Sequence, residues 1–355
     1  MLDYLRWRGD LPLTSVPFGE VDGLILSEMS MLLWEVGLTS KNPETLRSLW
    51  PLMNNKHFSF GMSAADDIKL LEFASGCERF ENVIMADYLP SCDRDSAMQF
   101  AAVTFLLPDG TAFISYRGTD DTLVGWKEDF KMSCSTFIPS QKAALVYLKT
   151  IASQFGGALR VGGHSKGGNL AMYASAMAGE GIRKRVVHVY NYDGPGFKDN
   201  SLARTIYGRI NSVLTYFVPH ASIVGLLLNH SERLEIIKSK SRSIFQHDPY
   251  SWQVEGGHFV RVSDLSKDSR YIELVIKRCL LMVNEEERLL FIDILFHVLE
   301  AANTRKFSKT FLLELFRHPK AVLSSIQDID QPSKKHFIGI LKRIPLAFMP
   351  SPKAK

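Results

Sequence analysis

Apolar residues follow two different patterns along the chain. Apolar positions at helical spacing predict helices over 21–34, 64–73 and 141–155. Nearly continuous apolar runs predict buried strands over 100–107, 111–116, 158–162, 186–192 and 213–218. The first two of these strands flank Pro108-Asp109-Gly110, which is typical of a hairpin turn. Strands that alternate with helices predict an α/β fold whose central sheet is mostly parallel, covered by helices, with an antiparallel start.

The pattern changes at about Ser263. Asn284 and Glu287 have the spacing of a capping box, which predicts the start of a long amphipathic helix that runs to Ala302. Further helices are expected over 311–317 and 334–343, and β-branched runs are absent there. We therefore expect two parts, a domain over 1–262 that includes the N-terminal helical segment and a C-terminal helical module over 263–355. This module has no chemistry or partner that its sequence identifies.

Composition narrows the function classes. The chain has 355 residues, of which 46% are hydrophobic and 23% charged, and its formal net charge is +4. The sequence has no basic block with interleaved aromatic residues, so it does not indicate nucleic-acid binding. The longest uncharged central stretch, 210–231, contains Pro219 and Gly225 and fits a strand and loop better than a membrane span.

The cysteines and the N-terminus bear on the compartment. Cys77, Cys92, Cys134 and Cys279 lack metal-ligand spacing, so we expect reduced thiols in the cytoplasm, no metal and no cofactor. Charged residues among the first ten argue against a signal peptide.

One pentapeptide stands between a predicted strand and a predicted helix. Gly163-His164-Ser165-Lys166-Gly167 has the G-x-S-x-G pattern, and an alanine-rich segment follows it. In this context Ser165 is expected on a sharp turn in a strained conformation, with its hydroxyl raised above the sheet. The two outer glycines avoid clashes that a Cβ atom would cause. We interpret Ser165 as a nucleophile rather than as a bystander in a glycine-rich turn.

The strand over 111–116 is followed by Arg117-Gly118-Thr119, and then by Trp126 and Asp129. Together with the pentapeptide and the following Gly-Asn-Leu-Ala, this segment resembles the fungal-type (class 3) lipases. The chain more closely resembles a bacterial family of lipase-like α/β-hydrolases of unknown function. The segments that carry this closer resemblance are Asp193-Gly194-Pro195-Gly196-Phe197 and Gln246-His247-Asp248 with Trp252.

These resemblances imply an α/β-hydrolase fold with a C-terminal helical extension and a small-molecule or lipid-like ester as substrate. They also imply that Thr119 and the backbone N–H of Lys166 form an oxyanion hole. The Lys166 side chain itself is expected to be solvated. Asp120 is expected to cap a short lid helix, and Trp126 to pack that segment against the body of the protein.

The base of such a hydrolase is a histidine late in the chain, since the order is serine, acid, histidine. His220, His230, His247 and His258 all follow Ser165. His247 is the best match because it follows a strand-like run over 243–245, and His258 is the alternative. His164 is expected to shape the turn rather than to act as the base.

The acid is where the sequence departs from the lipases. Ser222 stands about where their aspartate is found, after the strand over 213–218. Asp193 directly follows the preceding strand and is our choice, and Asp248, next to His247, is the alternative. A turn-capping role would also explain Asp193.

The sequence thus predicts a serine hydrolase that acts on carboxylic esters through an acyl-enzyme on Ser165. Two alternatives stay open. One is a thioesterase or amidase with the same chemistry, and the other is an inactive hydrolase fold that serves as a binding or scaffold module.

Overall fold

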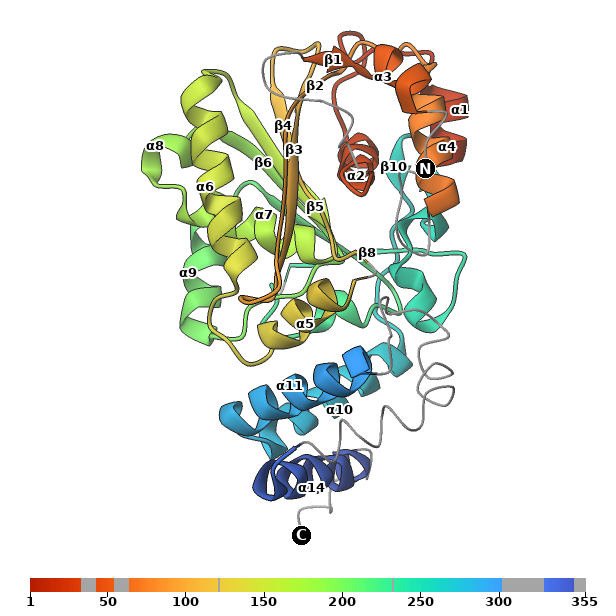
Figure 1. Ribbon diagram of the computed structural model, residues 1–355. Helices are drawn as coiled ribbons and strands as arrows, with labels where there is room; N and C mark the ends of the chain where they lie inside the picture. The colour runs from red at the N-terminus through yellow and green to blue at the C-terminus, as the bar shows by residue number, and fades with distance from the viewer. Residues whose placement is uncertain (33–42, 54–63, 121, 232, 302–328, 348–355) are drawn as a thin grey trace.

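A computed structural model describes residues 1–32, 43–53, 64–120, 122–231, 233–301 and 329–347. Its centre is an eight-stranded sheet in the order β1-β2-β3-β4-β5-β6-β7-β8 (Figure 1). The strands are β1 (Glu44–Thr45), β2 (Ile84–Asp93), β3 (Met98–Leu106), β4 (Ala112–Tyr116), β5 (Leu159–His164), β6 (Val186–Tyr192), β7 (Leu214–Pro219) and β8 (Glu235–Ile237). A separate small hairpin pairs β9 (Val254–Glu255) with β10 (His258–Phe259).

The sheet has an antiparallel and a parallel half. β1 to β4 pair antiparallel, and β4 to β8 pair parallel. The predicted hairpin around Pro108-Asp109-Gly110 is confirmed by the register of Leu106 with Ala112. The α/β class with helices around a mostly parallel sheet is likewise confirmed.

The sequence reading missed β2. Its residues are mostly half-buried or exposed, it contains Pro90, and its register shifts between Ala86 and Leu89. An edge-side strand of this kind lacks the apolar run that marks a buried strand.

Helices α6 (Pro139–Gln154), α7 (Lys166–Met177) and α9 (Asn200–Ile210) cover one face of the sheet (Figure 1). Short α8 (Glu180–Arg183) precedes β6. Because parallel strands in sequential order have right-handed connections, successive connecting helices lie on the same face. Ile114, Val161 and Val189 point into the core on this side.

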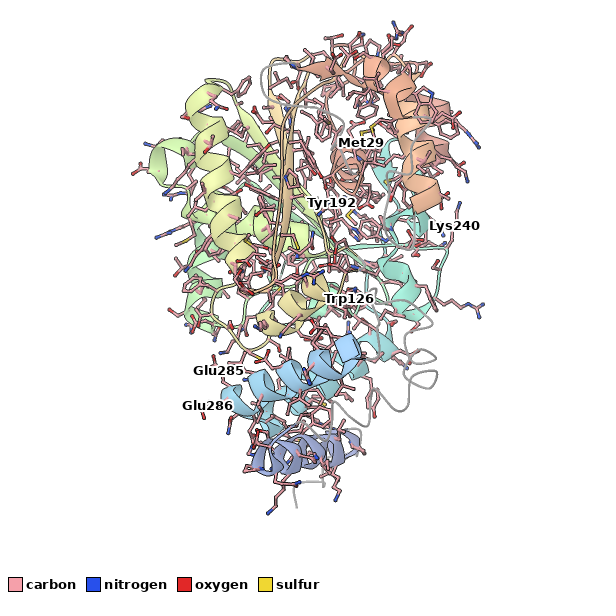
Figure 2. All side chains as sticks on the ribbon, viewed as in Figure 1. Met29, Trp126, Tyr192, Lys240, Glu285 and Glu286 are labelled. Carbon is pink, nitrogen blue, oxygen red and sulfur yellow. The ribbon has the colours of Figure 1, made fainter. Side chains whose placement is uncertain are left out.

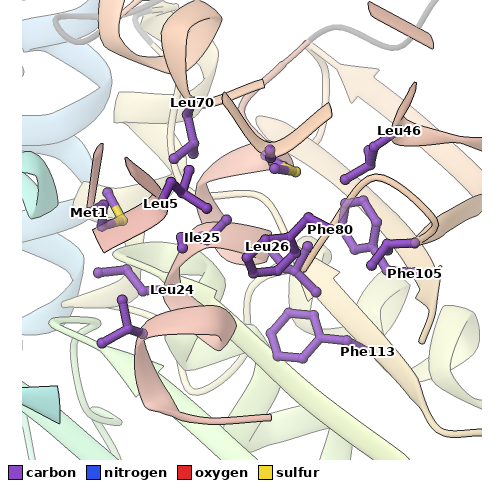
Figure 3. Packing of buried hydrophobic residues seen from close by; sticks show 14 of the residues in the cluster. Met1, Leu5, Leu24, Ile25, Leu26, Leu46, Leu70, Phe80, Phe105 and Phe113 are labelled. Carbon is purple, nitrogen blue, oxygen red and sulfur yellow. The ribbon is translucent and has the colours of Figure 1, made fainter. Parts of the chain in front are cut away.

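The N-terminal segment covers the opposite face. Its helices are α1 (Leu2–Arg8), α2 (Glu20–Met29), α3 (Leu46–Met53) and α4 (Ala64–Ser75). Leu24, Ile25 and Leu26 of α2 pack in one cluster with Phe105 and Phe113 of the sheet (Figure 3). Strand residues therefore alternate between two cores, and α2 lies against β4, β5 and β6.

The C-terminal helices are α10 (Lys267–Met282), α11 (Glu285–Ala301) and α14 (Gln331–Ala347). Helix α11 packs against α5 (Leu123–Met132), and α14 packs on α10 and α11 at the side away from α5 (Figure 1). The capping box is confirmed, because the Glu287 N–H donates to Asn284 Oδ1 at 2.9 Å and the Asn284 N–H to Glu287 Oε2 at 3.0 Å. The helix expected over 311–317 lies outside the described residues. The division at residue 263 stays a prediction.

A buried ion pair fixes the N-terminal segment. The Arg79 guanidinium donates to both carboxylate oxygens of Asp22 at 2.7 and 2.6 Å, and both side chains are 1% exposed. The same guanidinium donates to the carbonyls of Leu11, Val16 and Pro17. One cation thus holds the chain before α2 against the turn after α4.

We predict that Arg79→Met lowers the free energy of unfolding by about 3–5 kcal/mol, because it leaves the Asp22 carboxylate buried without its counterion. Denaturant unfolding followed by circular dichroism measures this loss. Lys184→Met is the control, since the Lys184–Glu180 pair is 74% and 71% exposed. Its loss should stay below about 1 kcal/mol. Equal losses in the two variants would contradict the role given to Arg79.

Candidate active site

Ser165 forms the joint between β5 and α7. Its backbone has φ 56° and ψ −131°, a conformation that costs a non-glycine residue energy. A Cβ atom on Gly163 would lie 2.4 Å from the carbonyl carbon of Gly167, and one on Gly167 would lie 2.1 Å from the Tyr116 carbonyl oxygen. The steric reason given for both glycines is therefore confirmed.

Ser165, His247 and Asp193 form one hydrogen-bonded chain. Nε2 of His247 lies 3.0 Å from Oγ of Ser165, and Nδ1 lies 2.7 Å from Oδ2 of Asp193. Ser165 follows β5 and Asp193 follows β6, so adjacent parallel strands bring both to the same edge of the sheet. Asp193 is fully buried, and the His247 side chain is 25% exposed. This geometry allows the imidazole to accept the hydroxyl proton while the carboxylate holds the other ring nitrogen.

The second oxygen of Asp193 is also satisfied. Oδ1 accepts a short hydrogen bond from the Ser222 hydroxyl and another from the Gly225 N–H at 3.1 Å. Ser222 itself is 1% exposed, so its hydroxyl is buried beside the acid. The serine that follows β7 therefore supports a carboxylate that follows the neighbouring strand, β6.

His247 ends a 3-10 helix, η2 (Ser243–His247), where the sequence reading expected a strand-like run. No sheet partner lies beside this described segment, and side chains fix it instead. Trp252 Nε1 donates to the Gln246 carbonyl at 2.7 Å, and Gln246 Oε1 accepts from the Ala221 N–H at 2.9 Å. The imidazole is thus carried on a loop that is anchored on both sides.

The other late histidines and the alternative acid have different partners. His258 lies on β10 with its side chain 76% exposed, 3.8 Å from Glu20. His230 faces the Ser231 carbonyl and Glu273, and His220 Nε2 lies 3.4 Å from the Gln246 amide. Asp248 caps the next turn, η3 (Pro249–Ser251), by accepting from the Tyr250 N–H. Of the four late histidines considered, only His247 is hydrogen-bonded to Ser165 in the described structure.

The loop after β4 passes beside Ser165. A Cβ atom on Gly118 would lie 2.9 Å from the His164 carbonyl oxygen and 3.5 Å from Cβ of Ser165. Thr119 Oγ1 donates to Oδ2 of Asp129 at 2.6 Å. Because a hydroxyl has one hydrogen, the donor that Thr119 can offer to a substrate in this arrangement is its backbone N–H.

The Lys166 side chain is buried, whereas the sequence analysis expects it to be solvated. It is 1% exposed, and its Nζ donates to the Gln99 carbonyl and amide oxygens, both at 2.7 Å, and to Glu128 at 2.9 Å. Glu128 lies on α5 and also accepts from the Ser140 hydroxyl and N–H. The Lys166 ammonium therefore links α5 to α7 through Glu128. Because it is buried and paired with that carboxylate, it cannot attract a substrate.

Asp120 and Trp126 hold the start of α5. Asp120 accepts from the Thr122 N–H at 3.0 Å, while Thr122 itself is the N-cap, bonded to the Gly125 N–H. Trp126 packs against a cluster that includes Phe296 of α11 (Figure 2). The segment expected to be a short lid is helix α5, which is packed between Lys166 of α7 on one side and α11 on the other.

His164 points away from Ser165. Its Nε2 lies 2.9 Å from the His247 carbonyl oxygen, and its Nδ1 lies 2.9 Å from Oε1 of Glu28. The sequence reading missed Glu28 and Glu128. Glu28 carried a visible signal, since a carboxylate in an otherwise apolar helix requires a buried partner.

The described residues contain no group that could hold a metal ion. Within the same residues, no helix is long and apolar enough to cross a membrane.

A strand, a strained serine and a helix, followed by an acid and a histidine in that order, form the arrangement of an α/β-hydrolase fold. The Mbeg1-like family model matches residues 74–297, and the chain belongs to this family. The chain is also similar to a crystal structure of M37 lipase, with 12% identity, 92% of this chain and 99% of that chain covered, and a TM-score of 0.41. No curated protein matches the chain.

Asp129 generates a pH prediction. Its Oδ1 is buried without a hydrogen-bond partner in the described structure. Burial raises the pKa of Asp129 from 3.8 to about 6, although Lys166 and the Thr119 hydroxyl oppose this shift. The fold thus favours the protonated acid, and the carboxylate destabilises it above pH 6.

We therefore expect Asp129→Asn to be more stable than the parent protein at pH 7.5, on the order of 1–3 kcal/mol. This difference should shrink as the pH falls through 6 towards 4, because Asp129 then becomes protonated in the folded state. Denaturant unfolding at several pH values measures it. A difference that is independent of pH would contradict the assigned burial of charge.

Proposed function

We propose that the protein is a serine hydrolase that cleaves carboxylic esters through an acyl-enzyme on Ser165. The observation that carries this proposal is the continuous chain from Ser165 Oγ through His247 to Asp193, at 3.0 and 2.7 Å. These are the distances at which a base can take the hydroxyl proton and a carboxylate can orient that base.

In acylation, Nε2 of His247 accepts the hydroxyl proton as Ser165 Oγ attacks the ester carbonyl carbon. The buried carboxylate of Asp193 keeps Nδ1 protonated and stabilises the imidazolium that forms. The backbone N–H groups of Thr119 and Lys166 would donate to the oxyanion, aided by the N-terminus of α7. The imidazolium then gives its proton to the leaving alcohol as the bond between carbon and alcohol oxygen breaks.

In deacylation, water attacks the acyl carbon while His247 takes its proton. The tetrahedral intermediate collapses, the acid product leaves, and the proton returns to Ser165 Oγ. No cofactor or metal enters this sequence. The resemblance of the sequence to class 3 lipases favours acyl esters with a lipid-like acyl group as substrates. The cysteine pattern favours the cytoplasm as the compartment.

The two alternatives differ in what supports them. The missing lipase aspartate favoured an inactive scaffold, and Asp193 with its donors Ser222 and Gly225 removes that support. A thioesterase or amidase would use the same residues, so substrate turnover must separate it from an esterase.

We predict that Ser165→Ala and His247→Ala each lower kcat for p-nitrophenyl acyl esters by roughly a millionfold. Asp193→Asn should lower it by about 10⁴, because an amide cannot stabilise the imidazolium. A chain-length series of these esters, with matched acyl thioesters and anilides, identifies the bond that is cleaved.

Ser153→Ala is the control, since this exposed hydroxyl lies at the end of α6 and donates to the Thr150 carbonyl. It should leave kcat unchanged. Ester hydrolysis that survives in folded Ser165→Ala would refute the proposal. Turnover of thioesters or anilides alone, dependent on Ser165, would reassign the bond, and a folded parent protein without any turnover would favour the scaffold.

A further inference from the structure

The residue before the nucleophile lies in an unusual electrostatic setting. His164 is 9% exposed, and each of its ring nitrogens faces an oxygen. Nε2 is hydrogen-bonded to the backbone carbonyl of His247 at 2.9 Å, and Nδ1 lies 2.9 Å from Oε1 of Glu28, an ion-pair contact in which the N–H is not aligned for a hydrogen bond. A carbonyl and a carboxylate can only accept hydrogen bonds, and only a doubly protonated imidazole carries a hydrogen on both nitrogens.

Glu28 supplies the charge that this state needs. It lies on α2, which packs against β5 from the face opposite α7, and it is 3% exposed. Burial opposes protonation of His164, but Glu28, and to a smaller extent Asp193 and the His247 carbonyl, together raise its pKa above the ordinary value of 6.5. The ring of His164 also lies against the ring of His247, with centroids 4.7 Å apart.

We propose that the Glu28–His164 ion pair is a positioning device for the catalytic base, in which an imidazolium on the elbow strand holds the carbonyl of His247. His164 contacts neither the Ser165 hydroxyl nor a reacting atom in this arrangement. It acts through the backbone of His247, and so it sets the direction from which Nε2 meets Oγ. This inference rests on the proposed function, because it assigns His247 as the base.

The Glu28–His164 ion pair gives the N-terminal helix α2 a role in the geometry of the active site. The loop that carries His247 is closed at its base by antiparallel backbone pairing of Ser239 with Trp252. Beyond that base the η2 segment has no strand pairing in the described structure, so side-chain contacts position it. A misplacement of about 1 Å in a catalytic group can cost about a hundredfold in rate. The N-terminal segment therefore contributes Glu28 to the geometry of the site as well as apolar surface to the core.

Two matched double variants test the positioning role. Both carry Glu28→Gln, so neither leaves a buried carboxylate unpaired. His164→Gln retains an N–H that can donate to the His247 carbonyl, whereas His164→Leu has no donor. We expect the variant with His164→Leu to lose about tenfold to a hundredfold in kcat with little change in KM. The variant with His164→Gln should recover most of that loss.

Equal kcat values in the two double variants would overturn the proposal, because a residue that only fills space would not require a hydrogen-bond donor at this position. A circular dichroism melt of each variant shows that it is folded at the assay temperature.

A second measurement does not depend on activity. Nitrogen-15 NMR of labelled histidines, assigned with the His164 variants, should show His164 mostly doubly protonated at pH 6.5 in the parent protein. In Glu28→Gln its titration midpoint should fall below that of the parent protein, because the carboxylate that does most to offset burial is gone. A neutral His164 at pH 6.5 in the parent protein would overturn the inference. Charged His164 without any ester turnover would refute the proposed function and leave the ion pair established.

Discussion

The buried carboxylate of Asp193 is the constraint on which the site depends. Three donors from two segments converge on it: the His247 imidazole from one loop, and the Ser222 hydroxyl and the Gly225 N–H from the turn after β7. A buried charge is tolerated only when its hydrogen bonds are satisfied, so these segments must meet whenever the protein is folded. Helix α10 reaches the same point, because the Ser269 hydroxyl donates to the Ser222 carbonyl.

The two faces of the sheet contribute different things. Right-handed connections place α6, α7 and α9 on one face and leave the other to the N-terminal helices. On that second face two buried carboxylates are matched with cations or imidazoles, Asp22 with Arg79 and Glu28 with His164. Each pair joins α2 to a segment distant in the sequence, Asp22 to the turn after α4 and Glu28 to the end of β5. The helix that fills the core therefore also connects the N-terminal segment to the strand that precedes Ser165.

Local sequence patterns predict the fold and the turn that carries Ser165. The positions of buried charged side chains depend on tertiary contacts and could not be predicted in this way. Apolar runs predict β3 to β7. The G-x-S-x-G pattern alone indicates that positions 163 and 167 have no room for a Cβ atom, as the structure shows. Ser165, His247 and Asp193 were nominated from motif and strand position, and the structure brings these three together. Lys166 was misread because its partners Gln99 and Glu128 are remote in sequence, and no local pattern reports a long-range ion pair.

The central claim is that Ser165 Oγ is activated by His247. Intact-protein mass spectrometry after exposure to a fluorophosphonate tests it most directly, since this probe requires an activated serine and no knowledge of the substrate. The account predicts one adduct per chain, mapped to Ser165 and abolished by His247→Ala. A folded protein that acquires no adduct, or acquires it at another residue, would contradict it.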